Sequence, residues 1–339
     1  MGVFKNKDAK KTEKEKVAER REEVLSQGRK FKYPLQWSRH RIIINTILIT
    51  LVVVAMIIVS IWLALYRFNM TDEILFRITR VVPVSVATVD GQDVQFSDYL
   101  MLYRSGIISI ERQSGSQFDD QSLDQLRQEY KRSALTEAEK YTYALKLASE
   151  QNITVSDDEV ASGFERHLKL GGIERSEESF IKIVNDNFGL SKSEYERMLY
   201  LSLIKSKVAA AIDENANQVA TKVENLLAAN DNNFQAVAET MGDAVSYQET
   251  GGLVDSKNID GGRATEAMKL EPGASSGRFV STNGDGYYFV KLVSKTDSEV
   301  NFVSIFVPFS EFSSRFDALS TDNKISEYIT LSATNEITE

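Results

Sequence analysis

The sequence predicts an α+β protein with a single transmembrane helix, a mainly helical module, and then a small antiparallel sheet with helices. Three observations lead to this prediction. Residues 42–66 form a long apolar run without a charge, and apolar residues then recur at three- and four-residue steps through residues 84–212. Near the C-terminus, residues 287–293 alternate with the period of two that is typical of a β-strand.

The apolar run Ile42–Tyr66 is long enough to cross a bilayer. As a helix, these uncharged residues would extend about 37 Å at 1.5 Å per residue, and a hydrocarbon core is about 30 Å thick. Arg39 and Arg41 precede the run, and Trp62 and Arg67 mark its far end, as at a membrane interface. A cleaved signal peptide would be shorter, would lie nearer the N-terminus and would carry an A-x-A cleavage site.

Charge divides the chain at this run. Residues 1–41 contain 13 Lys and Arg against 6 Asp and Glu, a net charge of +7. Because the whole chain has a net charge of −9, the remaining residues carry a net charge of −16. Because basic flanks stay in the cytoplasm, we expect a cytoplasmic tail at 1–41 and extracytoplasmic domains in a single-pass protein of the cell membrane. The tail mixes charges without interleaved aromatic residues, so no nucleic-acid partner is expected.

The composition excludes several kinds of chemistry. The chain has no cysteine and two histidines, His40 and His167, which rules out thiolate nucleophiles, disulfides, iron–sulfur clusters and cysteine-ligated zinc. His167 has no second histidine or cysteine near it in the sequence. We therefore expect neither a metal nor a cofactor.

Residues 67–83 are expected to form a juxtamembrane linker that ends at Pro83, and 84–212 a helical module. The pair Asp90-Gly91 lies between two short apolar runs and favours a type I′ hairpin turn. Five helices are expected next. The first begins after Ser97, and the second spans Leu123–Gln151 beyond a loop at 114–122. The third follows a Ser156/Glu159 capping box, the fourth lies between Ser176 and Gly189, and the fifth begins at Ser191 or Ser193.

From Asp213 the pattern changes to mixed helix and strand, and 213–309 is expected to form a second domain. Helices are predicted at 219–230, 234–242 and 264–270. A half-buried strand at 287–293 would place Tyr288, Val290 and Leu292 inward, and residues 300–307, apolar on both faces, would lie inside a sheet. Residues 310–339 are expected to form a weakly amphipathic tail.

Residues 84–212 resemble the N-terminal domain of SurA/PrsA-type extracytoplasmic foldases. The hairpin "VATVDGQDVQFSDYLMLY" is followed by a long helix and by "ASEQNITVSDDEV", which matches the family's closing phrase except that Asn152 replaces a glycine. The resemblance implies a domain that handles unfolded exported polypeptides.

Residues 213–309 resemble a divergent parvulin domain, the peptidyl-prolyl isomerase module of these foldases. The stretches "NNFQAVAETMGD", "TGGLVDS" and "ATEAMKLEPGASSGRFVSTNGDGYYFVKLVSK" follow the family pattern. An anchor with two such modules is similar to PpiD-like and PrsA-like proteins.

The resemblance places candidate site residues where this sequence departs from the family. Tyr288 occupies the position of a cleft histidine in "G-Y-H-I-I-K-L", and Met268 matches an apolar pocket region. The family's other histidine lies in a first strand, but "KVAAAIDENANQ" before Val219 predicts a helix and a linker instead. "VNFVSIFV" matches that strand, with Ser304 at the histidine position.

Two arrangements of this last strand remain open. The family's first and last strands are antiparallel neighbours, so a short turn from 287–294 to 300–307 would complete the same sheet in permuted order. Alternatively, residues 300–339 begin a truncated further module or pack back on the helical domain.

Three functions follow from the resemblance. Proline isomerisation requires an apolar cleft that favours a twisted amide, without metal or cofactor, and a hydrogen bond between Tyr288 and Ser304 could support it. Because both family histidines are replaced, we expect a membrane-anchored chaperone or foldase with weak or absent isomerase activity. The candidate catalytic residues are Tyr288 and Ser304, and the candidate substrate-binding residues are Met268 and Tyr288. The alternatives are an active parvulin-type isomerase and a structural envelope adaptor with one fixed partner.

Overall fold

The computed structural model describes residues 13–114, 120–169 and 173–331. The chain divides into two compact units, with the boundary between Ala64 and Leu65. The start of the predicted tail (1–12), most of the predicted loop (115–119) and the end of the predicted C-terminal tail (332–339) lie outside the described residues.

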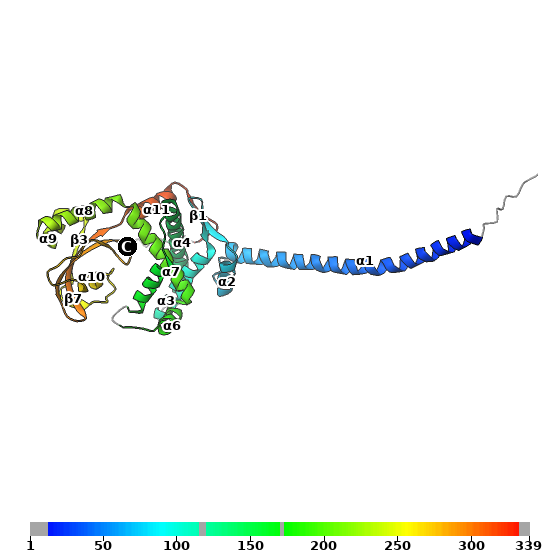
Figure 1. Ribbon diagram of the computed structural model, residues 1–339, viewed down its shortest axis with the longest axis horizontal. Coiled ribbons are helices and arrows are strands. Elements are labelled where there is room, and N and C mark those ends of the chain that lie inside the picture. The colour runs from blue at the N-terminus through cyan, green and yellow to red at the C-terminus, as the bar shows by residue number, and fades with distance from the viewer. Residues whose placement is uncertain (1–12, 115–119, 170–172, 332–339) are drawn as a thin grey trace, which may run out of the picture. The chain divides into compact units, whose positions relative to one another are not determined.

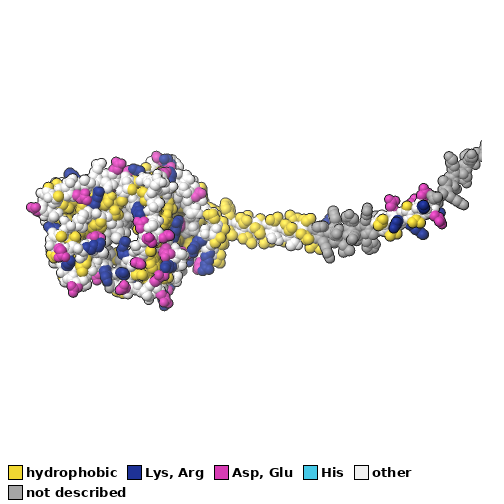
Figure 2. All heavy atoms as spheres, viewed as in Figure 1, with side chains coloured by type: hydrophobic (Ala, Val, Ile, Leu, Met, Phe, Trp, Pro, Cys, Tyr) yellow, Lys and Arg dark blue, Asp and Glu magenta, His cyan; other side chains and the backbone are white. Residues whose placement is uncertain are grey.

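The first unit contains one long helix. Helix α1 spans Glu13–Trp62 and continues as a π-helical turn, Leu63–Arg67. Its segment Arg41–Arg67 is long and apolar enough to cross a membrane, as predicted for 42–66, and Figure 2 shows its mainly hydrophobic surface. Polar side chains within it bond to their own helix, as a bilayer core requires: the Thr46 hydroxyl donates to the Ile42 carbonyl at 2.9 Å.

In the second unit, residues 73–212 form a helical module with a small hairpin (Figure 1). Its elements are α2 (Glu73–Val81), β1 (Ser85–Val89), β2 (Gln92–Gln95), α3 (Phe96–Ser114), α4 (Asp120–Gln151), α5 (Asp157–Leu168), α6 (Glu177–Phe188) and α7 (Lys192–Ile212). Helix α2 was not expected, because 67–83 was predicted to be a linker. It forms because Leu75 and Phe76 are buried where α2 packs on α3.

The capping signals of α5, α6 and α7 are confirmed, whereas the cap predicted at Ser97 was wrong, because α3 already begins at Phe96. The Glu159 carboxylate accepts from the Ser156 backbone N–H at 2.9 Å, and the Ser156 hydroxyl accepts from the Glu159 N–H at 3.3 Å. Gly189 ends α6 with a φ of 65°. Of the two serines proposed for α7, Ser191 is the N-cap.

The predicted hairpin is present and has a third strand. Asp90 and Gly91 both have positive φ, 48° and 82°, as a type I′ turn requires. Strand β8 (Ile325–Glu327) pairs with the free edge of β1, giving the order β2-β1-β8. Helix α11 (Glu311–Thr321) precedes β8 and packs Phe312 and Phe316 near Tyr143 of α4. Residues 310–331 therefore return to the helical module.

The remaining elements build a five-stranded antiparallel sheet with three helices. They are α8 (Glu214–Ala229), α9 (Phe234–Met241), a 3₁₀ turn (Gly242–Ala244), β3 (Ser246–Glu249), β4 (Val254–Asp255), α10 (Arg263–Met268), β5 (Phe279–Val280), β6 (Gly286–Lys295) and β7 (Glu299–Pro308). The strand order is β3-β7-β6-β5, with β4 also on β7. The inner position predicted for 300–307 is confirmed, and so is its pairing with 287–293, because β6 and β7 pair along most of their length.

Both faces of this sheet are covered, so the prediction that 287–293 is only half-buried was wrong. On one face, Tyr287, Phe289, Ile305 and Val307 pack on α8 and α9. On the other, Val290, Leu292 and Phe302 pack on α10, and Figure 1 shows the helices on opposite sides. Alternation in β6 separates two apolar faces rather than an apolar face from a polar one.

Asp213 connects the two parts of the second unit. Its buried carboxylate accepts from the Ala216 N–H at 2.8 Å, which caps α8, and from the N–H groups of Ser310 and Glu311 at 2.7 and 3.0 Å. Residues predicted as a linker before Val219 are therefore helical. One carboxylate caps α8 and also binds the start of α11.

Candidate functional site

A small cavity opens beside β3, β7 and the start of α10, and we call it the cleft. Its volume is about 140 Å³, smaller than the roughly 300–1,000 Å³ of typical small-molecule sites, so it is suited to a single side chain. Its lining residues are Gln248, Glu249, Thr250, Val254, Asn258, Asp260, Arg263, Phe302 and Ser304.

Ser304 lies in the cleft wall within a polar network. Its hydroxyl accepts from Arg263 Nη1 at 3.4 Å and donates to the Gln248 carbonyl at 3.5 Å. Arg263 also bonds to the Gln248 side chain, and its Nε donates to the Asp260 carbonyl at 2.8 Å. Arg263 thus fixes the orientation of the Ser304 hydroxyl.

Tyr288 lies on the same face of the sheet but is enclosed by other side chains. The register pairs Tyr288 with Phe306 and Val290 with Ser304, so Tyr288 and Ser304 are diagonal neighbours. The Tyr288 ring packs on Phe306 with centroids 4.7 Å apart. The Arg263 guanidinium lies 5.0 Å from the ring centroid, a cation–π distance. Burial raises the pKa of the Tyr288 phenol, and Arg263 partly offsets this.

Gly261 closes the other side of the Tyr288 ring. Its φ is +77°, and a Cβ there would lie 2.8 Å from the Tyr288 ring and 2.9 Å from Ser281 Oγ. Only glycine satisfies both the backbone conformation and the space. The hydroxyl bond considered between Tyr288 and Ser304 is not formed, because the Ser304 hydroxyl bonds to Arg263 and Gln248.

Met268 lies on α10 and packs against the cluster of Val290, Leu292 and Phe302. The three residues predicted from the sequence therefore share one face of the sheet. Of these three, Ser304 is in the wall of the cleft, whereas Tyr288 and Met268 pack beside it.

Sequence reasoning missed Arg263 and Asp260. The Asp260 carboxylate accepts from the Ala264 N–H at 3.1 Å at the start of α10. Burial raises the pKa of Asp260, against the opposing effect of Arg263. The stretch "IDGGRATEAM" carries the signal for Asp260, since an aspartate shortly before a helix is a common cap. No local signal showed that Arg263 would bond to Ser304, because the two residues are distant in the sequence.

A second cavity, which we call the inter-module groove, adjoins the cleft. Its volume is about 280 Å³, and it shares Asn258 and Asp260 with the cleft. Helix α5 of the helical module contributes Arg166, His167 and Lys169, and the sheet part contributes Lys257, Asn258, Ile259, Asp260, Gly262, Thr265, Thr282 and Asn283.

The groove combines an apolar side chain with cations. The Ile259 side chain is 70% exposed. Arg166, Lys169 and Lys257 are exposed and make no ion pair with any residue in the described ranges. These features are suited to an extended polypeptide with an apolar side chain flanked by acidic residues.

His167 has a structural partner at the edge of the groove. Its Nδ1 lies 2.6 Å from the Tyr195 hydroxyl, and burial, with a smaller effect of Arg166, lowers the pKa of the imidazole. Across residues 13–114, 120–169 and 173–331, no three His, Asp or Glu side chains gather as a metal site would require.

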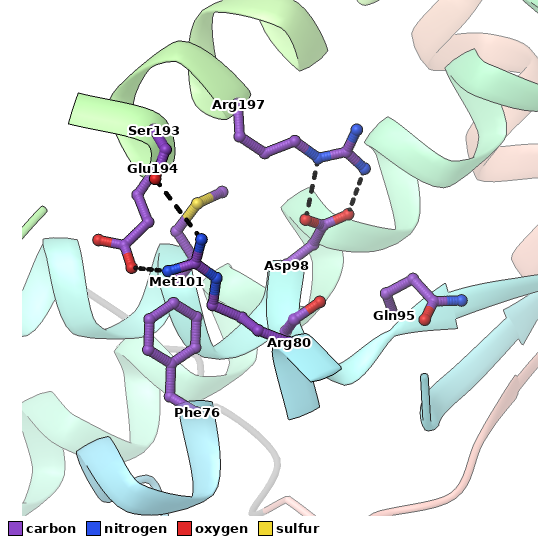
Figure 3. Close-up of a pocket in the computed structure, with 9 residues that line it drawn as sticks. Phe76, Arg80, Gln95, Asp98, Met101, Ser193, Glu194 and Arg197 are labelled. Atoms are coloured by element: carbon purple, nitrogen blue, oxygen red, sulfur yellow. Dashed lines mark hydrogen bonds and ion pairs between the residues drawn. The ribbon is translucent and has the colours of Figure 1, made fainter. Parts of the chain in front are cut away.

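A third cavity, the α2 pocket, lies between α2, β2, α3 and α7 and has a volume of about 360 Å³. Figure 3 shows its two ion pairs. Arg80 bonds to Glu194 at 2.9 Å, and Arg197 holds Asp98 through two bonds of 3.2 and 2.9 Å. The Arg80–Glu194 pair holds α2 against α7, and the Arg197–Asp98 pair holds α3 against α7. Because these charges neutralise one another, the pocket does not present them as free charge.

Comparison with known proteins supports part of the sequence interpretation. Residues 35–209, slightly more than half of the chain, match a family model described as the SurA-like N-terminal domain. No curated protein and no solved structure matched. The match covers the apolar span and almost all of the helical module.

Proposed function

Because the chain belongs to the family of the SurA-like N-terminal domain, we propose that it is a membrane-anchored, extracytoplasmic chaperone or foldase. In this proposal it binds unfolded segments of exported polypeptides and has weak or absent prolyl isomerase activity. The family membership points to chaperone-like foldases, and the net charge of +7 before the span favours a cytoplasmic N-terminus.

The observation that carries the proposal is that the cleft and the groove are adjacent. The two cavities share Asn258 and Asp260, so one extended client segment can place a side chain in the cleft and its neighbours along α5. Exposed Ile259 offers apolar contact. The three unpaired cations favour clients with acidic residues beside the apolar one.

The geometry around Tyr288 and Ser304 supports weak or absent isomerase activity. The Tyr288 ring is covered by Gly261, Phe306 and Arg263, and Ser304 is engaged by Arg263 and Gln248. The Ser304 hydroxyl is therefore not presented to a client amide as a free group. The pairing of β6 with β7 nevertheless makes the permuted parvulin-like sheet our preferred description of residues 213–309.

Client binding is tested with full-length protein in lipid nanodiscs and several unrelated unfolded clients. We expect Ile259→Glu to weaken suppression of client aggregation about tenfold. The matched control is Ile183→Glu, which changes another exposed isoleucine, on α6, and should leave suppression unchanged. Equal effects of both variants would contradict the role of the groove. Suppression limited to one client would favour a dedicated adaptor.

Isomerase activity is tested with a protease-coupled proline assay on the same preparation. We expect a rate close to the uncatalysed one, unchanged in Tyr288→Ala and Ser304→Ala. Clear catalysis that either variant removes would establish the alternative function, an active isomerase.

A further inference from the structure

The segment that follows the membrane span carries an unusually exposed apolar surface. Ile74, Ile78 and Val81 lie at four- and three-residue steps and share one face of α2. The exposed fractions are 72% for Ile74 and 82% for Val81. Just before α2, Phe68 is 66% exposed and Met70 is also exposed. We call these five side chains the α2 patch.

The α2 patch is not a frayed part of the chain, because α2 is fixed on its other face. Leu75, Phe76 and Thr79 of α2 are buried, and Arg80 bonds to Glu194 and Ser193 of α7 (Figure 3). The helix therefore has two apolar sides, of which one is packed and the other is open. An exposed apolar face on a helix that is fixed by its other face marks an interaction surface.

The residues from Leu65 onward belong to the second unit and are fixed within it. Leu65 is 1% exposed, the Tyr66 hydroxyl donates to the Ser85 carbonyl at 2.7 Å, and Asn69 Nδ2 donates to the Thr330 carbonyl at 2.7 Å. Leu65 and Tyr66 lie just before the α2 patch, and Asn69 lies between its members Phe68 and Met70. Since Ile74 follows Arg67 by seven residues, it stays within about 25 Å of the end of the span.

We propose that the α2 patch is a membrane-contact surface, which inserts into the interface of the leaflet at which the span ends. Because α2 follows the apolar span closely in the sequence, the bilayer that the span crosses is the nearest apolar environment for it. A helix with an exposed apolar face lies in the plane of the membrane interface. The span and the α2 patch then form two contacts with one membrane, which fixes the orientation of the second unit. This inference rests on the span and does not depend on client binding.

The absence of cysteine in the chain permits single-cysteine labelling. Full-length Ile74→Cys, Val81→Cys and the control Ile183→Cys are labelled with an environment-sensitive fluorophore. They are placed at one copy per nanodisc, in zwitterionic or anionic phospholipid with spin labels near the headgroups. We expect at least twofold quenching at positions 74 and 81 in both lipids, and little at 183, because the patch is apolar and Arg77 and Arg80 are already paired.

Equal quenching at all three positions, or none at 74 and 81, would overturn the proposal. A second outcome would also overturn the proposal: the fluorophore reports an apolar environment without quenching by the spin labels, and only at several copies per disc. That outcome would indicate contact between copies of the chain instead of contact with lipid. A second variant guards against local effects of labelling. In Met70→Cys, adding Ile74→Glu and Val81→Glu should lower quenching to the level of position 183, with an unchanged circular dichroism spectrum. Quenching that survives both glutamates would contradict insertion.

Discussion

The two sheets of the second unit are assembled in different ways. The five-stranded sheet is built from residues 246–308, with the helices that cover it close in sequence. The three-stranded sheet joins β1 and β2, which follow the apolar helix in the sequence, to β8, which lies more than 200 residues later. One sheet is local and covered on both faces, whereas the other closes the chain on itself.

This difference shows that the helical module is not self-sufficient, although the family match ends at residue 209. Its hairpin edge is paired by β8, and its helix α4 is covered by α11. Among the described residues, the sheet part receives no strand from the helical module. Its links to that module include Asp213 and Tyr287, whose hydroxyl donates to the Ala210 carbonyl of α7 at 3.4 Å. Local damage to residues 310–331 should therefore weaken the helical module first.

The largest effect is expected for Phe316→Ala. This buried ring packs near Tyr143 with centroids 6.2 Å apart, and truncating a buried phenylalanine costs about 4 kcal/mol of unfolding free energy. Hydrogen exchange should rise in β1, β8 and α4 before it rises in β6 and β7. Phe188→Ala, at an exposed ring, is the control. Equal acceleration in both sheets would show that they unfold together.

Asp213→Ala should have the next largest effect. It removes the acceptor of three backbone N–H groups, and we expect a loss of about 3 kcal/mol, since unsatisfied buried donors and a lost helix cap both destabilise. Urea unfolding should change from one transition to two as the coupling between the parts weakens. Asp243→Ala, at an exposed aspartate, should change the unfolding free energy by less than about 0.5 kcal/mol. A single unshifted transition in Asp213→Ala would contradict this role.

The smallest effect concerns pH. Burial, with a smaller contribution from Glu327 of β8, raises the pKa of Glu139 to about 7, and Arg132 opposes this. The folded state then holds this proton more tightly than the unfolded state, so the unfolding free energy is highest below pH 4.5. It should fall by roughly 2–3 kcal/mol as pH rises from 4.5 to 7.

The Glu139→Gln variant should lose this pH dependence and be more stable than the original above pH 7. Chemical unfolding between pH 4.5 and 8 measures both. An identical slope in the original protein and the variant would show that Glu139 is not the source of the pH dependence.

Much of the fold could be predicted because its signals are local. Asp90-Gly91, the Ser156/Glu159 box and Gly189 each specify a turn, a start or an end through neighbouring residues. The inner position of β7 could be predicted from apolar residues on both faces. The burial of both faces of β6 could not be predicted, because a period of two does not show whether the second face, which carries Tyr287 and Phe289, meets solvent or a further layer of helices.

The parts that were missed depend on distant contacts. Helix α2 was hidden because "EILFRITRV" is short and apolar on two sides, and its helical state depends on burial against α3. In the cleft, Ser304 could be proposed from the family resemblance. Its partner Arg263 could not, because their meeting depends on how α10 packs across β7.

The position of β8 sets the order in which this protein can mature during synthesis. The hairpin at Asp90-Gly91 leaves the ribosome first, but the strand that completes its sheet, residues 325–327, follows it by more than 200 residues. In an exported chain, the helical module would wait with an unpaired strand edge until residues 325–327 cross the membrane. A protein proposed to protect unfinished chains therefore carries an unpaired strand edge of its own until that later strand arrives.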